Sequence, residues 1–362
     1  MSTEASRPLS ILAWPAATPA NRYCEALYAN MADVRVDDFK PGWRMLLRLP
    51  SKRYDVFHIH WLERAFWRVG GLAIIRAVLV TLLTAAFIKL RGGVVVWTAH
   101  DPVPHQMGGN AFARAGLSAW LWKIYVALLS RMLDGVILLS AVHRDTLVAS
   151  RPHLRTRPMT ITPHPHFKGV YSNDLPRAEA RKRLALPAEA TTLLLLGAIR
   201  PYKNAEALIE AFRHLADRDL RLVIAGQPDS DDYAAELKTL AGGDSRIAFH
   251  FGFVADDDLQ LFLNAADAVV IPFRNATNSG SVALALSFAK PVAVPDMPVF
   301  REVRDIVGDD WIRLMPNALN PAELQDTIDW IGWKRAAAPD LDTLDWPQIA
   351  EKTQAFFRAV LT

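Results

Sequence analysis

Two short polar segments carry residue types that bind phosphate, and each lies between an apolar run and a helix-like run. Residues 278–281 read Asn-Ser-Gly-Ser and lead into the run 282–289, while residues 197–204 read Gly-Ala-Ile-Arg-Pro-Tyr-Lys-Asn and follow the run 192–196. Serine hydroxyls and the backbone N–H groups at the start of a helix suit an anionic group. Alternatively, the serines only cap the helix. The two segments favour a phosphate site made of Gly197, Arg200, Lys203, Asn204, Asn278, Ser279, Gly280 and Ser281.

Residues that could move a proton follow an apolar run in the N-terminal half. His100 and Asp101 end the segment 93–101. A carboxylate or an imidazole there could take the proton of a hydroxyl group. Asp101 is the best candidate for this base, and His100 and His105 compete with it. The alternative is that His100 and Asp101 only end a strand.

Two further histidine pairs stand out. His58 and His60 would lie on the same side of a strand, as metal chelation can require. No close-spaced His, Cys and Asp set of the metal-binding type accompanies them. We therefore favour a pair beside a substrate and expect no metal ion. His164 and His166 are either linker residues or substrate contacts.

Apolar strand-like runs alternate with helix-like runs along the chain, which is typical of α/β proteins with parallel sheets covered on both faces. The proline-rich stretch 151–188 separates two such blocks. The sequence thus predicts two Rossmann-like, doubly wound parallel-sheet domains facing a central cleft, with ligands beyond the carboxyl ends of the strands. We expect an N-terminal domain over 1–165, a C-terminal domain over 166–335, and a returning helical segment over 336–362. Expected strands are 9–14, 55–61, 93–101, 134–140, 192–197, 220–226, 246–251, 268–273 and 292–294. Expected helices are 22–31, 66–90, 112–131, 205–215, 231–241, 257–265, 279–290, 321–331 and 346–361.

Composition narrows the class of protein. At 362 residues the chain is too long for one ordinary core, and its net charge of +3 permits an anionic ligand or an acidic membrane surface without requiring either. The single Cys24 excludes an internal disulfide. No basic region precedes the first apolar run, so we expect a cytoplasmic protein without a secretion signal. Neither G-x-G-x-x-G after the first strand of a block nor G-x-x-x-x-G-K-[ST] occurs, which disfavours dehydrogenases and P-loop NTPases.

The stretch 66–90 has two interpretations. It contains Arg68, Arg76 and Lys89 and no acidic residue, and its uncharged part, 77–88, is too short to cross a bilayer. It is either a buried helix or a helix lying on a membrane surface, with basic residues toward the headgroups. The second interpretation predicts peripheral contact with the cytoplasmic face of the inner membrane.

The C-terminal block resembles the GT-B glycosyltransferases, in particular the family 4-like group that elongates bacterial polysaccharides and lipid-linked glycans. That group has G-R-L followed by K-G, and Lys203 falls on the lysine. Further matches are Val-Ile-Ala-Gly at 223–226, Phe-Gly-Phe-Val at 251–254, Ala-Asp-Ala-Val-Val-Ile-Pro at 266–272 and Ala-Lys-Pro-Val-Ala-Val at 289–294. The resemblance covers most of the chain and is clearest from 193 to 294.

The chain departs from that group at three positions. The group's usual arginine is replaced by Ala198, and its two glutamates, E-x7-E, fall on Ala276 and Leu284. The glutamates touch the donor in retaining members. Their loss resembles divergent inverting relatives, such as the β-mannosyl- and glucuronosyltransferases of exopolysaccharide assembly.

The resemblance implies transfer of a sugar from a nucleotide diphosphate sugar, GDP-mannose or a UDP-hexose, to a glycan or lipid-linked glycan, with inversion. Lys203 and Arg200 would neutralise the departing diphosphate, so that no metal cofactor is expected. Phe253 and Val254 would lie at the donor, and Glu302 would contact its ribose or else form a surface salt bridge. No nucleic-acid partner is expected. The alternatives are a nucleotide-sugar 2-epimerase of the same architecture, and a non-catalytic relative that binds a partner or a glycan.

Overall fold

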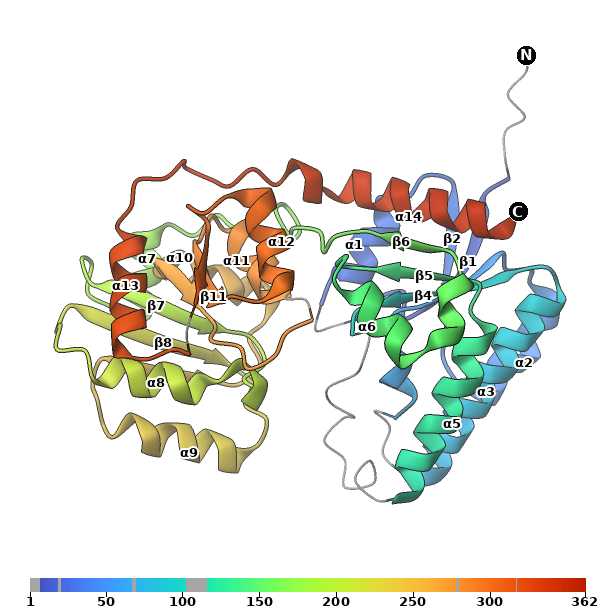
Figure 1. The fold of residues 1–362 in the computed structure, drawn as a ribbon, viewed down its shortest axis with the longest axis horizontal. Coiled ribbons are helices and arrows are strands. Elements are labelled where there is room, and N and C mark those ends of the chain that lie inside the picture. Colours follow the sequence, from blue (N-terminus) through green and yellow to red (C-terminus); the bar gives the residue numbers. More distant parts are fainter. Residues whose placement is uncertain (1–6, 19–20, 67–69, 102–115, 278–279, 317) are drawn as a thin grey trace, which may run out of the picture. The chain divides into compact units, whose positions relative to one another are not determined.

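The chain forms two compact units in a computed structural model that describes residues 7–18, 21–66, 70–101, 116–277, 280–316 and 318–362 (Figure 1). Unit 1 comprises Met1–Pro163 with Trp346–Thr362, and unit 2 comprises His164–Asp345. The division thus falls at Pro163 rather than at residue 165, and the returning segment begins at Trp346 rather than at 336.

Unit 1 contains a six-stranded parallel sheet of order β2-β1-β3-β4-β5-β6. The inner strands are apolar on both faces, as expected of a sheet covered by helices on both sides. β2 lies on one side of β1, and β3 to β6 follow on the other side, so the strand order reverses between β1 and its neighbour β3. The strands are β1 (Leu9–Trp14), β2 (Val34–Asp38), β3 (Val56–Ile59), β4 (Val94–Ala99), β5 (Gly135–Leu138) and β6 (Met159–Ile161).

Helices cover both faces of this sheet. One face packs against α2 (Trp43–Arg48), α3 (Gly71–Leu90), α5 (Gly116–Met132) and α6 (His143–Ser150) through an apolar cluster that includes Trp97. The other face is covered by α1 (Tyr23–Ala29) and the C-terminal helix α14 (Trp346–Leu361), which contact each other. The ring of Phe357 in α14 lies 4.9 Å from that of His58.

Helix α3 has one buried apolar face and one exposed apolar face. Ile74, Val78 and Ile88 are buried, whereas Leu72 and Leu83 are exposed. By length and composition α3 is long and apolar enough to cross a membrane, and 44% of its apolar window is buried within the protein. The helix is therefore a core element on one face and exposes apolar side chains on the other.

Unit 2 contains a second six-stranded parallel sheet, of order β12-β11-β10-β7-β8-β9. In order along the chain this is the 3-2-1-4-5-6 arrangement of dinucleotide-binding folds, with the reversal between β7 and β10. The strands are β7 (Thr191–Leu196), β8 (Leu220–Gly226), β9 (Ile247–Phe251), β10 (Ala268–Val270), β11 (Val292–Pro295) and β12 (Ile312–Met315).

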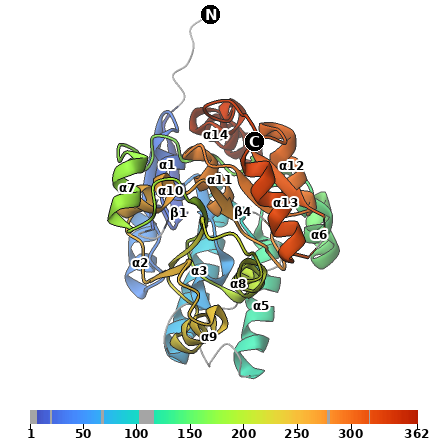
Figure 2. The ribbon, with the colours of Figure 1, turned by 90° about the vertical axis from the view of Figure 1, so that its left-hand side faces the viewer.

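Two apolar clusters lie on the two faces of this sheet. One joins the sheet to α10 (Leu259–Ala265), α11 (Gly280–Ser287) and α12 (Pro298–Val307), and the other to α8 (Ala205–Arg213), α9 (Asp231–Ala241) and α13 (Pro321–Ile331). Figure 2 shows α8 and α9 next to each other, in agreement with Figure 1 and with their contacts. The remaining helix, α7 (Arg177–Arg183), packs against α10. The expected α/β architecture of two doubly wound parallel sheets is confirmed.

Candidate functional site

The loops that follow β7 and β10 meet at the point where the sheet of unit 2 reverses its order. The chain runs from β7 toward β8 on one side and from β10 toward β11 on the other. In open α/β sheets, ligands bind in the crevice that such a reversal leaves beyond the strand ends. The segment 197–204 follows β7 and α11 begins at Gly280 after β10, so 197–204 and the residues Gly280 and Ser281 belong to this crevice.

Lys203 is the centre of this group. Its Nζ donates to the carbonyl oxygen of Leu196 at 3.0 Å and to Oγ of Ser281 at 3.1 Å. The side chain is 4% exposed, and within the described parts of the chain no carboxylate pairs with it. Burial, with a smaller contribution from the charge of Arg200, lowers the pKa of Lys203 to about 8. The protein thus holds a desolvated ammonium group against the first turn of α11.

Gly197 leaves room for this ammonium group. A Cβ atom at position 197 would lie 3.2 Å from Nζ of Lys203 and 3.5 Å from Oγ of Ser281. The φ angle of Gly197 is +100°, a conformation that other residues rarely adopt. Gly197, Lys203 and Ser281 are therefore brought together as the sequence predicted, with Gly280 as the first residue of α11.

Arg200 and Asn204 have partners within unit 2. Nη1 of Arg200 lies 3.2 Å from Oδ1 of Asp229. Asn204 adopts a left-handed conformation, with φ of 59°, just before α8, and its Oδ1 accepts a hydrogen bond from Nε of Arg274 at 3.0 Å. Neither Asp229 nor Arg274 was singled out from the sequence, because nothing in the spacing indicates these long-range contacts.

The other predicted donor contacts are dispersed around the carboxyl end of the sheet. Phe253, just after β9, is 66% exposed, whereas Val254 packs against the apolar cluster of α10, α11 and α12. Glu302 is half-buried on α12. Asn278 and Ser279 lie outside the described residues.

The two positions at which the resembling group has glutamates are apolar in their surroundings as well as in their side chains. Ala276 and Leu284 are both partly buried against the apolar cluster of α10, α11 and α12. No carboxylate is therefore provided at either position.

His164 lies close to the start of α11. A Cβ atom on Gly280 would be 3.5 Å from Nε2 of His164, whose Nδ1 is 2.8 Å from the carbonyl oxygen of Pro165. Burial lowers the pKa of His164 to about 4, so its imidazole is neutral at physiological pH. His166 instead lies 3.3 Å from Oδ1 of Asp345.

In unit 1 the polar residues at the ends of β3 and β4 form a buried network. Nδ1 of His58 and Nε2 of His60 lie 2.7 and 2.9 Å from the hydroxyl oxygen of Tyr28 in α1. Nδ1 of His60 lies 3.1 Å from Nε2 of His100, and the indole of Trp61 stacks on the His100 ring at 4.4 Å.

Of the candidates for the base, His100 is thus buried in this network and Asp101 follows it at the end of β4. His105 lies outside the described residues. Tyr28 was missed by the sequence reasoning, since a tyrosine on a short helix carries no distinguishing signal. Within the described part of the chain, no three His, Cys, Asp or Glu side chains are grouped so as to hold a metal ion.

The sequence of this chain is similar to those of known proteins. Residues 176–331 match the family model described as "Glycosyl transferases group 1". The "GDP-mannose:glycolipid 4-beta-D-mannosyltransferase" of Xanthomonas campestris pv. campestris is 28% identical over 333 residues, which cover 91% of this chain and 86% of the relative.

Solved structures share the fold over nearly the whole chain. HepE from Anabaena, solved with UDP and glucose, has a TM-score of 0.66 and 16% identity, with 97% of this chain and 100% of that chain covered. A putative UDP-N-acetylglucosamine 2-epimerase from Listeria monocytogenes has a TM-score of 0.57 and 14% identity, with coverages of 98% and 96%.

The two parallel sheets, each reversing its order in the middle, define a protein of the GT-B fold. The fold alone does not separate transferases from epimerases, since both occur among the structures that it matches. The sequence matches separate them: the chain is a GT-B glycosyltransferase, as the resemblance predicted.

Proposed function

We propose that this glycosyltransferase moves a mannosyl group from GDP-mannose to a glycolipid acceptor, with inversion at the sugar carbon. Donor and acceptor are those named for the Xanthomonas relative, which aligns with most of the chain. A UDP-hexose is the alternative donor, because HepE was solved with UDP and glucose.

The buried ammonium group of Lys203 is the observation that carries this proposal. A buried charge without an opposite charge beside it is strongly unfavourable, even where it makes hydrogen bonds, so an anion is needed to complete the site. A diphosphate fits, because the Ser281 hydroxyl and the first N–H groups of α11 can donate to it beside the lysine. Arg200, on the same loop, adds a second cation.

These groups would act mainly on the leaving group. The acceptor hydroxyl attacks the sugar carbon, the bond from that carbon to the diphosphate oxygen breaks, and the nucleoside diphosphate departs with the bonding electrons. Fixed donors at the diphosphate stabilise the charge that develops there. The hydroxyl proton goes to a base, for which Asp101 in unit 1 is our candidate. In this scheme Lys203 and Arg200 supply the positive charge that metal ions supply in other transferases.

The surroundings of the site support inversion and suggest how the nucleoside is held. The apolar positions Ala276 and Leu284 provide none of the carboxylates that touch the donor in the retaining group. The exposed ring of Phe253 offers a face on which a guanine base can stack. Glu302 on α12 is our candidate for the ribose contact.

Replacing Lys203 by methionine tests the proposal. We expect Lys203→Met to weaken GDP binding by about 10- to 100-fold, the usual effect of removing a charged hydrogen-bond donor, and to abolish mannosyl transfer. Lys290→Met is the matched control. Lys290 is also a largely buried lysine of unit 2, with a pKa lowered to about 8 and a hydrogen bond to a backbone carbonyl oxygen. It lies after the C-terminal end of α11, whereas Lys203 lies at the N-terminal end of this helix.

Titration calorimetry with GDP, UDP and ADP, together with melting curves of both variants, gives the readout. Equal GDP affinity in Lys203→Met and the native protein would refute the assignment. Conversion of GDP-mannose to another sugar nucleotide without any acceptor would instead support an epimerase.

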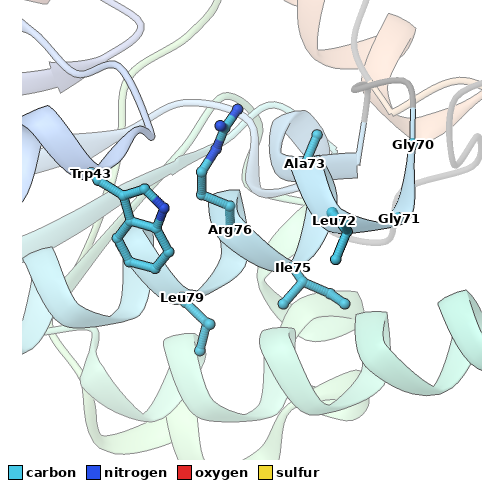
Figure 3. Close-up of a pocket in the computed structure, with 8 residues that line it drawn as sticks. All are labelled: Trp43, Gly70, Gly71, Leu72, Ala73, Ile75, Arg76 and Leu79. Carbon is cyan, nitrogen blue, oxygen red and sulfur yellow. The ribbon is translucent and has the colours of Figure 1, made fainter.

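We also propose that the outer face of α2 and α3 lies against an anionic membrane on its cytoplasmic side, where a glycolipid acceptor would be embedded. A hollow of about 660 Å³ lies along α3. Figure 3 shows Trp43 from α2 beside Arg76 and Leu79 from α3, which line this hollow. Leu72 in the same hollow is 86% exposed, and Leu47 in α2 is 80% exposed. Apolar side chains so exposed on a soluble unit mark an interaction surface.

A second hollow, of about 910 Å³, adjoins the first and shares Trp43 and Arg76 with it. It is more polar than the first hollow, and its basic residues outnumber its two acidic residues, Asp37 and Asp38. Apolar side chains beside a basic patch are what insertion below anionic headgroups requires. The basic residues are Lys40, Arg44, Arg48, Lys52 and Arg76.

A further inference from the structure

The polar hollow beside α2 holds more positive charge than its own carboxylates balance. Its lining includes the five basic residues named above and the carboxylates of Asp37 and Asp38, which leaves a formal charge of +3. Its volume of about 910 Å³ is within the range of pockets that hold small-molecule ligands. We name it the basic hollow, and we name the first hollow, along α3, the apolar hollow.

Both carboxylates of the basic hollow already have partners within unit 1. Oδ2 of Asp37 accepts hydrogen bonds from Nζ of Lys52 at 2.6 Å and from the Tyr54 hydroxyl at 2.7 Å. Partial burial opposes ionisation of Asp37, but the bonds from Lys52 and Tyr54 outweigh it and hold the pKa of this carboxyl below its usual value. Oδ1 of Asp38 accepts the backbone N–H of Ala16 at 3.0 Å. Lys52 is therefore the cation that these carboxylates balance.

The other four cations of the basic hollow are left without an opposite charge. Across the part of the chain that the structure describes, no ion pair and no side-chain hydrogen bond involves Lys40, Arg44, Arg48 or Arg76. All four residues are exposed. Like charges held around one hollow repel one another, and a bound anion removes that repulsion.

Three of these four cations are arginines, which suit phosphate. A guanidinium group presents a planar fork of N–H donors that matches two phosphate oxygens at once. Arg44 and Arg48 are four residues apart on α2, so they lie on the same face of that helix, and Arg76 comes from α3. Several arginines around one hollow favour a group with many phosphate oxygens and at least two negative charges.

The apolar hollow indicates that this phosphate belongs to a lipid. The two hollows share Trp43 and Arg76. A ligand in the basic hollow therefore has exposed leucines beside it, among them Leu72 and Leu79. A free phosphate compound would leave these leucines in water, whereas a lipid covers them with the start of its tail.

The basic hollow also adjoins the edge of the sheet at which we place the acceptor hydroxyl. Asp37 and Asp38 lie at the carboxyl end of β2, and Asp101 follows β4 in the same parallel sheet. In the order β2-β1-β3-β4 these two strands are three strand spacings apart, about 14 Å across the sheet. A few sugars attached to a bound headgroup span such a distance.

We propose that the basic hollow is the binding site for the headgroup of the lipid acceptor. It takes a phosphomonoester or a diphosphate that carries at least two negative charges, and the apolar hollow takes the start of the lipid tail. The proposal rests on the glycolipid acceptor and the membrane surface proposed above. It goes beyond a general attraction to anionic lipid, because it assigns one headgroup chemistry to one site and names Arg44, Arg48 and Arg76 as its phosphate ligands.

Titration calorimetry with inorganic pyrophosphate tests this site. The Lys203→Met protein is used, so that pyrophosphate does not report on the donor site and the result does not depend on whether GDP binds there. This protein should bind pyrophosphate, and adding Arg44→Gln together with Arg48→Gln should weaken the binding at least about tenfold, because two charged donors are lost. No binding to the Lys203→Met protein, or equal affinity after the arginine replacements, would overturn the proposal.

Arg144→Gln together with Arg155→Gln is the matched control, in the same Lys203→Met background. Arg144 in α6 and Arg155 just before β6 are exposed, and β6 is the edge of the sheet opposite to β2. The control loses the same net charge outside the basic hollow, so its affinity for pyrophosphate should change less than about twofold at physiological salt. Equal weakening in the two double variants would reduce the effect to general electrostatic attraction and contradict the proposal. Melting curves show whether each variant is folded.

Vesicles decide between a lipid headgroup and a free phosphate compound. At equal negative surface charge, the native protein should bind phosphatidylcholine vesicles that contain phosphatidic acid, a phosphomonoester, at least about fivefold more tightly than vesicles that contain phosphatidylglycerol, a phosphodiester. Arg44→Gln together with Arg48→Gln should abolish this preference. Pyrophosphate binding without any preference for phosphatidic acid would make the ligand a free phosphate compound and refute the lipid assignment.

Discussion

The buried ammonium group of Lys203 should make nucleotide binding depend on pH. Because burial lowers its pKa to about 8, the lysine of the ligand-free protein loses its proton as the pH rises through 8, well before an exposed lysine would. A diphosphate binds the charged form, so the Kd for GDP should rise by up to about tenfold per pH unit above 8 and stay constant below it. Calorimetry between pH 7 and 9.5 measures this directly.

A Lys203→Arg variant is the control for that pH dependence. Arginine keeps its charge throughout the range, so the Kd of this variant should not change between pH 7 and 9.5. Calorimetry in buffers of different ionisation enthalpy should also show proton uptake on binding to the native protein above pH 8. A pH-independent Kd in the native protein would mean that Lys203 does not meet the phosphate.

The sequence could place Lys203 and Ser281 near each other, because both follow apolar strands of one parallel sheet. It could not show that the ammonium group is buried or that Gly197 makes room for it, since both depend on packing. Nor could it reveal Tyr28, which reaches His58 and His60 only because α1 covers that face of the sheet. Side-chain roles that depend on contacts distant in sequence are invisible to spacing.

Among the elements, α7 is attached to the sheet of unit 2 by one buried arginine. Arg181 is 2% exposed and donates to Asp267 and to the carbonyl oxygens of Ala265, Pro187, Ala188 and Ala190. Arg181→Met removes all of these hydrogen bonds and leaves the Asp267 carboxylate with Arg177 and the backbone N–H of Thr192. Because it breaks a largely buried ion pair, it should lower the free energy of unfolding by about 3–5 kcal/mol. Urea denaturation followed by circular dichroism measures the loss.

Arg183→Met, on the same helix, provides the comparison. Arg183 is exposed and pairs with Glu179 one turn earlier, and such surface pairs contribute little to stability. Its denaturation curve should therefore overlie that of the native protein. If Arg181→Met had the same free energy of unfolding as Arg183→Met, α7 would be held by its apolar side chains instead of by Arg181.

The central strands were predictable, whereas three of the four edge strands were not; the fourth, β9, was predicted because it reads Ile-Ala-Phe-His-Phe. Strands such as β4 and β7 are buried on both faces, so they appear in the sequence as unbroken apolar runs. The missed strands β2, β6 and β12 are edge strands: β2 reads Val-Arg-Val-Asp-Asp, and β6 is three residues long within a proline-rich stretch. Edges need less apolar surface and carry charge, which removes the signal.

At the scale of the whole molecule, the sequence predicted two doubly wound sheets from the alternation of its elements, and the resemblance predicted a glycosyltransferase. Both are confirmed. From the sequence alone, the stretch that contains α3 was either a buried helix or a helix lying on a membrane surface. The structure shows that the inner face is core and that the outer face exposes leucines beside arginines, which the composition of 66–90 could not distinguish.

Binding of the whole protein to vesicles tests the proposed membrane surface. The native protein should bind phosphatidylcholine vesicles containing one-third phosphatidylglycerol at least tenfold more tightly than pure phosphatidylcholine, because the basic hollow attracts anionic headgroups, and added salt should weaken the binding. Replacing Leu72 and Leu79 together by glutamate removes two inserting side chains and adds repulsion, so it should lower vesicle binding at least tenfold. GDP binding by unit 2 should be unchanged in this variant.

Trp333→Glu is the control. Trp333 is an apolar residue of unit 2 that is 56% exposed, and its replacement should leave vesicle binding intact. Flotation of the Leu72/Leu79 variant equal to that of the native protein would show that α3 does not meet the lipid.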